Sequence, residues 1–497
     1  MGDRGVQEIF NKASQLGGRA PAAENITLWN LPLVVPASCL LKVDLIFERI
    51  AGRLRRLRSH LFSLLAILFR TDGTSCGSIS QGELDYKSLP LDEEFTAWLE
   101  QQRFRGRQVI LLSDAPAELC NLFVERLNLS SRLECGLSTQ PSSVPRFEFL
   151  HEKFPEGFAY AGRGQADLDM WAASKAVIFC RVPSHLAKTV RGLGKPVLAE
   201  FPPLRIAPSA WVRMFRPHHW VKNLLLFAPG LFGNVLSDPG VFLRCTIGFV
   251  LLGIVASCTY LVNDVLDLDM DRQHRSKATR PFASGEMSVM FGFVLPPLGI
   301  VLGILGSSYI SGQFTIALSS YALLTLSYSF VLKRLAILDA LTIAGLYVLR
   351  LVMGSVLANV PFSPWLLTFA MFFFFSLVLA KRQTEIHGTI DGSCMALREA
   401  YRSSDAPLTL ALGVASGTAS IIVMNLYLME EVFGQTLYLH PTRLWAVPTG
   451  VGIWLCHIWL FAHRGELDDD PVHFALRDPT SLVLGLGVLA ALALAIL

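Results

Sequence analysis

Apolar and polar residues are distributed differently in the two parts of this 497-residue chain. Up to about residue 205, charged residues occur at the density usual for a soluble domain, whereas the later part alternates long apolar runs with short charged clusters. A helix that crosses a bilayer needs roughly 20 apolar residues. The pattern therefore predicts an N-terminal extension (1–30), a soluble domain (31–205) and a membrane domain (211–497).

Apolar stretches of membrane-crossing length recur throughout the membrane domain. The apolar segment 60–69 has only ten residues and follows an arginine-rich sequence, so we expect an amphipathic helix of the soluble part there. We predict about nine spanning helices, at 218–236, 241–262, 288–307, 312–331, 337–357, 363–380, 408–428, 444–462 and 480–497.

Basic residues are concentrated in alternate loops of the membrane domain. The loops after the second, fourth, sixth and eighth expected helices carry lysines and arginines, those after the third and fifth carry none, and the loop after the seventh has only Arg443. The positive-inside rule places the basic loops in the cytoplasm. Segment 1–30 lacks the features of a secretory signal. We therefore expect an integral protein of the cell (inner) membrane whose N-terminal domain and charged loops are cytoplasmic.

The amino-acid composition is typical of a membrane protein and limits the classes of ligand and partner to be expected. Hydrophobic residues make up 52% of the chain and charged residues 17%, against roughly 25% charged in soluble domains. The net charge of +3 gives no reason to expect nucleic acid as a partner. The nine cysteines are scattered without a CxxC pair, which argues against structural disulfides and zinc.

An acidic cluster lies at the cytoplasmic end of the second expected helix. If that helix continues, Asn263, Asp264, Asp267 and Asp271 fall within about 100° of one face, and Asp269 points elsewhere. Carboxylates on one face repel each other unless a cation lies between them. Because Mg²⁺ prefers carboxylate, water and phosphate oxygens, the first four residues are predicted to bind Mg²⁺.

The acidic cluster is followed by the basic residues Arg272, Lys277 and Arg280. Their positive charges suit phosphate oxygens, so the segment as a whole predicts a diphosphate site beside the bilayer. The alternative is a loop whose acids and bases merely pair with one another. The alignment of four polar groups and the cost of carboxylates at the membrane edge favour the functional interpretation.

Further polar residues lie within or at the ends of other expected helices. Asp339 begins the fifth, and Arg350 lies about 20° away on the same face, three turns deeper. An arginine at that depth needs an anionic partner, either a neighbouring acid or a substrate. Lys222, Asn223, Asp339, Arg350 and Lys381 are candidates for positioning a second substrate.

The acidic cluster resembles the first aspartate-rich motif, NDxxDxxxD, of the UbiA superfamily of intramembrane prenyltransferases. The second motif, DxxxD, is matched only by Asp339, because Ile343 stands at its other acidic position. Other segments resemble the decaprenyl-phosphate phosphoribosyltransferase branch, namely Arg216-Pro-x-x-Trp220-Val-Lys222-Asn223, Asp271-Arg-x-His-x-x-Lys-x-x-Arg-Pro, Ser363-Pro-Trp365, Lys381-Arg382-x-x-Glu385 and Asp470-Pro-Val-x-Phe-Ala.

The resemblance implies a UbiA-like bundle of nine helices, with Asp264, Asp267, Asp271 and Asp339 catalytic and Mg²⁺ as cofactor. The resemblance to the decaprenyl-phosphate phosphoribosyltransferase branch implies phosphoribosyl transfer from phosphoribosyl diphosphate to a polyprenyl phosphate, with loss of diphosphate. One alternative is prenyl transfer from a polyprenyl diphosphate to an aromatic or other small acceptor. Another is a non-catalytic membrane scaffold. The oligomeric state stays open, a homo-oligomer included.

The soluble domain alternates apolar runs with helical stretches, which predicts an α/β doubly wound sheet. It resembles the haloacid-dehalogenase phosphatases, but their DxDGT motif is replaced by Pro36-Ala-Ser-Cys-Leu40. Arg163 stands where a metal-binding aspartate is expected, and Asp167 remains. Because proline cannot act as the nucleophile, we predict a pseudophosphatase, a structural or regulatory module that binds phosphate through Ser113 and Arg163.

Overall fold

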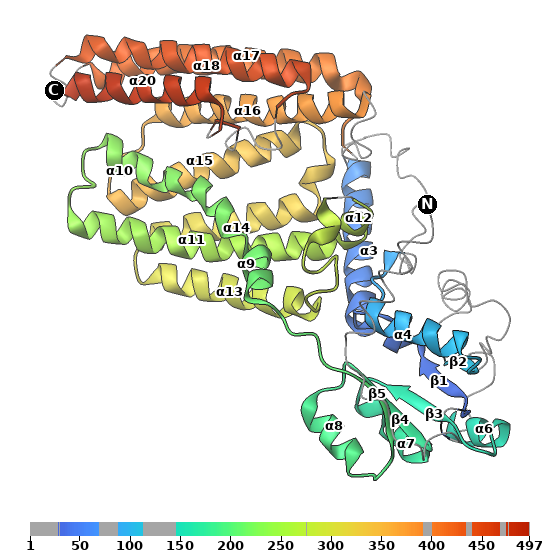
Figure 1. Ribbon diagram of the computed structural model, residues 1–497. Helices are drawn as coiled ribbons and strands as arrows, with labels where there is room; N and C mark the ends of the chain where they lie inside the picture. The colour runs from blue at the N-terminus through green and yellow to red at the C-terminus, as the bar shows by residue number, and fades with distance from the viewer. Residues whose placement is uncertain are drawn as a thin grey trace. The chain divides into compact units, whose positions relative to one another are not determined.

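The computed structural model describes residues 28, 30–68, 88–112, 146–274, 276–390, 400–433, 440–467, 474–475 and 477–496. Contacts divide the chain into two compact units (Figure 1). The α/β unit comprises Met1–Gly52, Glu83–Trp211 and Leu268–Val289, and the helical unit comprises Arg53–Gly82, Val212–Asp267 and Met290–Leu497.

The α/β unit contains a parallel sheet with strand order β2-β1-β3-β4-β5. The strands are β1 (Leu33–Pro36), β2 (Val109–Leu112), β3 (Ala159–Gly162), β4 (Ala176–Cys180) and β5 (Val197–Phe201). The helices are α4 (Glu93–Phe104), α6 (Arg146–Lys153), α7 (Leu168–Ala173), α8 (Ser184–Arg191) and α9 (Pro208–Phe215). Strand β4 is buried along its whole length, as expected of a sheet that is covered on both faces. The predicted parallel α/β sheet is therefore confirmed.

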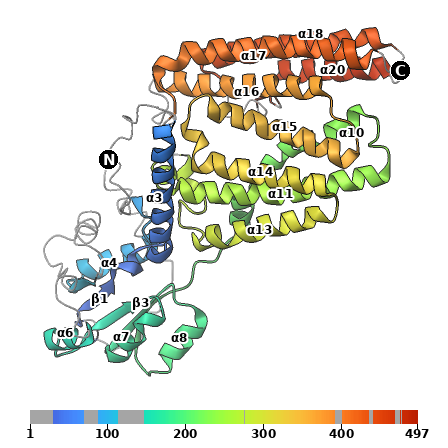
Figure 2. The same cartoon turned by 180° about the vertical axis from the view of Figure 1, so that it is seen from behind.

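The helical unit is built from long apolar helices. In both views, α16, α17, α18 and α20 form one layer, and α11, α13 and α14 form another, with α15 between them (Figures 1 and 2). The helices are α11 (Pro239–Leu266), α13 (Met290–Ser308), α14 (Gly312–Phe330), α15 (Leu338–Ala358), α16 (Pro364–Ile390), α17 (Ala406–Tyr427), α18 (Ala446–Arg464) and α20 (Pro479–Ile496).

Six helices in the described part of the chain are long and apolar enough to cross a membrane, fewer than the nine expected. They lie at Pro239–Leu266, Met290–Ser308, Leu338–Ala358, Pro364–His387, Ser403–Val432 and Pro441–Arg464. Helix α14 forms where a span is expected, but its serine, threonine and tyrosine residues lower its hydropathy. The apolar part of α20 is shorter than the others. Residues 60–68 form the end of the 24-residue helix α3 (Leu45–Leu68), and they belong to the helical unit rather than to the soluble part as expected.

The first expected span, 218–236, is not a continuous helix. It is a 3-10 helix, η5 (Pro217–Phe227), followed by the short α10 (Ala228–Phe232). Proline lacks the N–H that a helix interior needs, and Pro229 stands near the junction. A Cβ atom on Gly354 of α15 would lie 2.1 Å from the carbonyl oxygen of Leu226. Glycine thus lets the irregular segment pack directly on α15, which shields its backbone.

The acidic cluster spans a helix end. Helix α11 stops at Leu266, Asp267 is its C-cap, and α12 (Leu268–Gln273) starts directly afterwards. The amide of Asp267 still donates to the carbonyl of Asn263 at 2.9 Å, so Asp267 belongs to the last turn of α11. The expectation of one continuous helix face was therefore wrong for Asp271, which lies on α12.

Candidate functional site

The first carboxylate of the acidic cluster is paired with an arginine. Asp264 is 4% exposed, and Nη2 of Arg216 lies 2.7 and 2.6 Å from its two carboxylate oxygens. Arg216 adopts a left-handed conformation, with φ of 50°, which is uncommon for a residue other than glycine. The ion pair therefore fixes the turn from which η5 begins.

The second carboxylate lies between two cations. Nζ of Lys333, in the 3-10 helix η7 (Leu332–Arg334), is 2.6 and 2.7 Å from the oxygens of Asp267 and 3.1 Å from Oδ1 of Asn263. Nη1 of Arg58, on α3, is 3.0 Å from Oδ1 of Asp267. Burial alone would raise the pKa of Asp267, but the charges of Lys333 and Arg58 outweigh it and lower that pKa. Asp267 is therefore ionised at neutral pH.

The donor set at the end of α11 fits a Mg²⁺ ion that is shared with a substrate. Among the described residues, no three His, Cys, Asp or Glu side chains converge as a closed metal cage. The oxygens of Asn263 and Asp267 nevertheless meet at one ammonium group, so they are placed to share a positive charge. Mg²⁺ in proteins usually has one or two carboxylate ligands and completes its coordination shell with water and phosphate oxygens. Asp264 and Asp267 can provide the carboxylates.

The remaining charged residues of the acidic segment lie in the α/β unit. Nη1 of Arg280 is 2.6 Å from Asp271, and Lys277 is exposed in the 3-10 helix η6 (Lys277–Thr279). All three guanidinium nitrogens of Arg272 are engaged, two with the buried Glu48 and one with the carbonyl of Ala283. Arg272 thus takes part in a structural ion pair, and its contact with phosphate stays a prediction.

A second cation lies deep in the helical unit. Arg350 is 5% exposed and donates to Oδ1 of Asn223 at 3.0 Å, to the hydroxyl of Tyr321 at 2.8 Å and to the carbonyl of Leu346 at 2.8 Å. Lys222 lies close enough to interact electrostatically with Tyr321. Two residues that were predicted separately, Asn223 and Arg350, are therefore in direct contact.

The group of polar side chains around Arg350 has the character of an anion site. In the part of the chain that the structure describes, no carboxylate pairs with Arg350, although a buried arginine needs compensation. Nδ2 of Asn223 is buried and has no hydrogen-bond partner among the described residues. An unneutralised guanidinium and an unused amide donor together suit a phosphate or carboxylate ligand.

Asp339 pairs with an arginine of α16 rather than with Arg350. Nε of Arg382 is 2.8 Å and the hydroxyl of Tyr401 is 2.6 Å from its oxygens, and Arg382 also contacts Glu385 at 2.6 Å. Burial and the Asp339 carboxylate raise the pKa of Tyr401, so its hydroxyl remains a donor. Lys381, the neighbour of Arg382, is half-buried. The network holds Asp339 rigidly at the start of α15.

Arg163 and Asp167 of the α/β unit are engaged with backbone groups. The Arg163 guanidinium donates to four carbonyls of segment 38–43, at 2.8 to 3.3 Å. Asp167 accepts from the amides of Arg163 and Gly164 and from the hydroxyl of Tyr160. The guanidinium is thus committed to the loop after β1, contrary to the expected phosphate contact. Ser113 lies outside the described residues.

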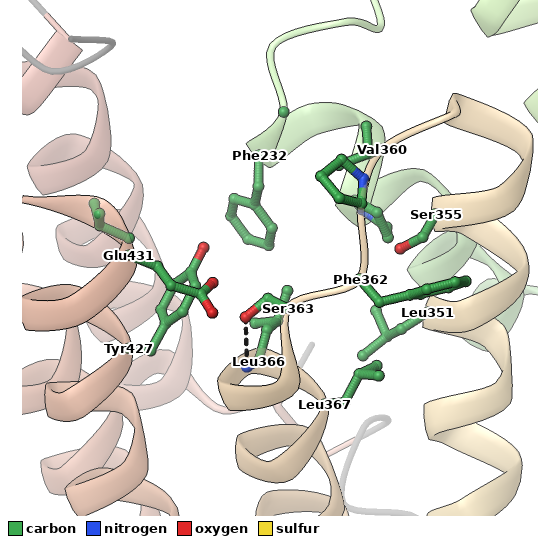
Figure 3. Close-up of a pocket in the computed structure, with 14 residues that line it drawn as sticks. Phe232, Leu351, Ser355, Val360, Phe362, Ser363, Leu366, Leu367, Tyr427 and Glu431 are labelled. Carbon is green, nitrogen blue, oxygen red and sulfur yellow. Dashed lines mark hydrogen bonds between the residues drawn. The ribbon is translucent and has the colours of Figure 1, made fainter. Parts of the chain in front are cut away.

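A cavity of about 330 Å³ lies near the other end of α15. Tyr427 and Glu431 lie on one side of it, and Leu351 and Ser355 of α15 lie on the other (Figure 3). Ser355, which lines it, is sixteen residues beyond Asp339 on the same helix, or about 24 Å at 1.5 Å per residue. The cavity is therefore separate from the carboxylates.

The sequence model of the UbiA prenyltransferase family matches residues 225–477, just over half of the chain. The chain belongs to this family. The matched range includes the acidic residues at the end of α11, Lys333, and the buried Arg350. Membership confirms the family resemblance and identifies the helical unit as that of a membrane transferase.

Similar proteins cover different shares of the chain. An uncharacterized protein, y4nM, of Sinorhizobium fredii is 37% identical over 417 residues, which cover 82% of this chain and 80% of that protein. The decaprenyl-phosphate phosphoribosyltransferase of Mycobacterium tuberculosis is 28% identical over 234 residues, covering 46% of this chain and 77% of that protein. A solved UbiA homolog from Archaeoglobus fulgidus, bound to DMAPP and Mg²⁺, has 15% identity and a TM-score of 0.46, covering 58% of this chain and 100% of that one.

Proposed function

We propose that the helical unit transfers a phosphoribosyl group from phosphoribosyl diphosphate to a polyprenyl phosphate, with Mg²⁺ and with loss of diphosphate. The observation that carries this proposal is the buried Arg350, which lacks a carboxylate partner among the described residues and lies beside the unused amide of Asn223. The donor has a 5-phosphate besides its diphosphate, and the acceptor also ends in a phosphate. This reaction therefore needs an anion site besides the carboxylate end of α11, and we assign that site to the polar groups around Arg350.

The carboxylate end of α11 is assigned to the diphosphate. When bound there, Mg²⁺ would neutralise charge on the departing diphosphate. Asn263, Asp264 and Asp267 would hold the ion, and Lys333 lies against the same oxygens, where its ammonium can bind phosphate oxygens. Asp271, Lys277 and Arg280 remain candidate metal and diphosphate residues, and Lys222 and Lys381 remain candidates for positioning the other substrate.

The acceptor chemistry also favours a phosphate. A phosphate monoester has a second pKa near 6, so its oxygen is already ionised when it attacks C1 of the ribose as the C1–diphosphate bond breaks. No base is then needed, and Arg350, which donates hydrogen bonds to Asn223 and Tyr321, offers an anion a positive charge and N–H groups rather than a proton acceptor. Prenylation of an aromatic carbon must in addition remove a proton from the ring. A carboxylated aromatic acceptor is the second candidate, because Arg350 would bind its carboxylate equally well.

Donor labelling separates the two reactions. Membranes that contain the protein are given ribose-labelled phosphoribosyl diphosphate with polyprenyl phosphates of several chain lengths, and in parallel labelled polyprenyl diphosphate with an aromatic carboxylate. We expect a labelled lipid only in the first set. A labelled prenylated aromatic product in the second set, with none in the first, would contradict the proposal.

We further propose that the α/β unit is a pseudophosphatase with a structural role. Strand β1 ends with Pro36 instead of a nucleophile, and the Arg163 guanidinium donates to four carbonyls of the segment that follows it. Arg163→Ala is expected to speed amide hydrogen exchange in segment 38–43 by at least about tenfold, since hydrogen bonds to a charged group contribute roughly 1.5–3 kcal/mol. The exposed Arg191, paired with Glu200 and placed over the ring of Phe179, gives a matched control, because Arg191→Ala removes a surface ion pair and a ring contact that both lie outside segment 38–43.

Unchanged exchange in Arg163→Ala, or hydrolysis of a phosphate monoester by the wild-type α/β unit within the full chain, would contradict this assignment.

A further inference from the structure

Helix α3 brings an arginine from outside the family-matched region to the acidic motif. The helix follows β1 in the chain and ends at Leu68, well before residue 225, where the family match starts. Its residue Arg58 belongs to the helical unit, and Nη1 lies 3.0 Å from Oδ1 of Asp267. Only 7% of the Arg58 side chain is exposed.

Arg58 keeps an unused donor at this position. Its Nε is buried and has no hydrogen-bond partner in the described part of the chain. A buried donor without a partner is destabilising, so native proteins usually leave one only where a ligand or water binds. Lys333 contacts the same Asp267 carboxylate at 2.6 Å. Two cations thus surround one carboxylate, and the excess positive charge suits an anion.

We propose that Arg58 is a diphosphate-binding residue of the transferase site, supplied by a helix outside the family-matched region. The inference rests on the proposed function, because it takes the Mg²⁺–diphosphate complex as the ligand. A guanidinium presents five N–H groups in a planar fork that matches phosphate. The contact with Asp267 uses one nitrogen and orients the group, and Nε is left for a phosphate oxygen.

The start of helix α3 is held by a second ion pair, within the α/β unit. Glu48 is fully buried, and its two oxygens lie 2.5 and 3.2 Å from the guanidinium nitrogens of Arg272. Removing one partner of such a buried pair is strongly destabilising, because the other charge is left uncompensated. The first turn of α3 is therefore fixed within the α/β unit, whereas Arg58 and Asp267 both belong to the helical unit.

Binding of inorganic pyrophosphate with Mg²⁺ to the purified full-length protein tests the proposal without requiring turnover. Calorimetry should give an affinity for Arg58→Ala that is lower than that of the wild type by about 10- to 100-fold, the loss expected for a hydrogen bond to a charged group. Arg58→Lys, which keeps the charge but loses the fork, should fall between them. Arg53→Ala serves as the control, because Arg53 is exposed on the same helix and should bind as the wild type does.

The outcomes are distinct. If the wild type binds pyrophosphate and Arg58→Ala binds it equally well, Arg58 is only structural, and this inference fails while the proposed function stands. Where Arg58→Ala does not fold, Arg58→Lys takes its place in this comparison. If either variant binds more tightly, Arg58 competes with the ligand for Asp267 and the inference is overturned. If the wild type itself does not bind pyrophosphate with Mg²⁺, the proposed function fails first.

Discussion

Replacing Asp267 with asparagine is expected to lower kcat/KM for transfer on the order of 10³-fold, the loss that follows removal of a principal charge-stabilising group. Asp267 contributes a carboxylate that two cations hold ionised. Asparagine has the same shape but no charge, so it would bind the metal poorly and would leave Lys333 and Arg58 without their counter-ion. Initial rates at several Mg²⁺ concentrations measure the effect, and excess Mg²⁺ should restore part of the rate.

Asp238 provides the matched control at the opposite end of α11. Its side chain caps the helix by accepting from the amide of Gly240 at 2.8 Å, and asparagine is an equally good N-cap. Asp238→Asn should therefore retain full activity. If Asp267→Asn and Asp264→Ala both kept the cellular role of the protein, the non-catalytic scaffold would replace the transferase as the best interpretation.

Arg350→Ala should weaken the use of one substrate, raising its KM on the order of 100-fold, because a charge-assisted hydrogen bond to a buried anion contributes roughly 1.5–3 kcal/mol. The affected substrate should be the polyprenyl phosphate or the phosphoribosyl donor. Mg²⁺–pyrophosphate binding at the carboxylate end of α11 should stay unchanged. Separate titrations of each substrate and of pyrophosphate measure this.

Arg350→Lys keeps the charge but loses the directed contacts to Asn223 and Tyr321, so an intermediate KM is expected. Arg244→Ala is the control, because Arg244 is exposed near the start of α11. An Arg350→Ala enzyme with unaltered KM values for both substrates would remove the reason for a second anion site.

Local sequence was sufficient to predict that part of the acidic cluster shares one helix end. Asn263, Asp264 and Asp267 lie within the last turns of α11, where periodicity holds. The contact between Asn223 and Arg350, which are 127 residues apart, did not follow from local sequence. Periodicity failed at Asp271, because nothing at Leu266 marks a helix end as a proline or glycine would. The broken first span had such a mark in Pro229.

Long-range partners could not be derived from the sequence. Arg272 was expected to meet phosphate, yet its partner Glu48 lies 224 residues away. Lys333 lies in one of the basic loops from which the membrane orientation was predicted, and its contact with Asp267 was not expected. Arg382, not Lys381, meets Asp339. Which of two adjacent charges points inward depends on packing, and a single sequence does not define it.

The mass of the lipid product tests phosphoribosyl transfer most directly. The purified protein is incubated with Mg²⁺, phosphoribosyl diphosphate and a polyprenyl phosphate, and the extracted lipid is examined by mass spectrometry, with Asp267→Asn as the blank. We predict a polyprenyl phosphate that has gained one phosphoribosyl group, with one diphosphate released per product. Unmodified lipid at every chain length, beside active prenyl transfer to an aromatic acceptor by the same preparation, would contradict it.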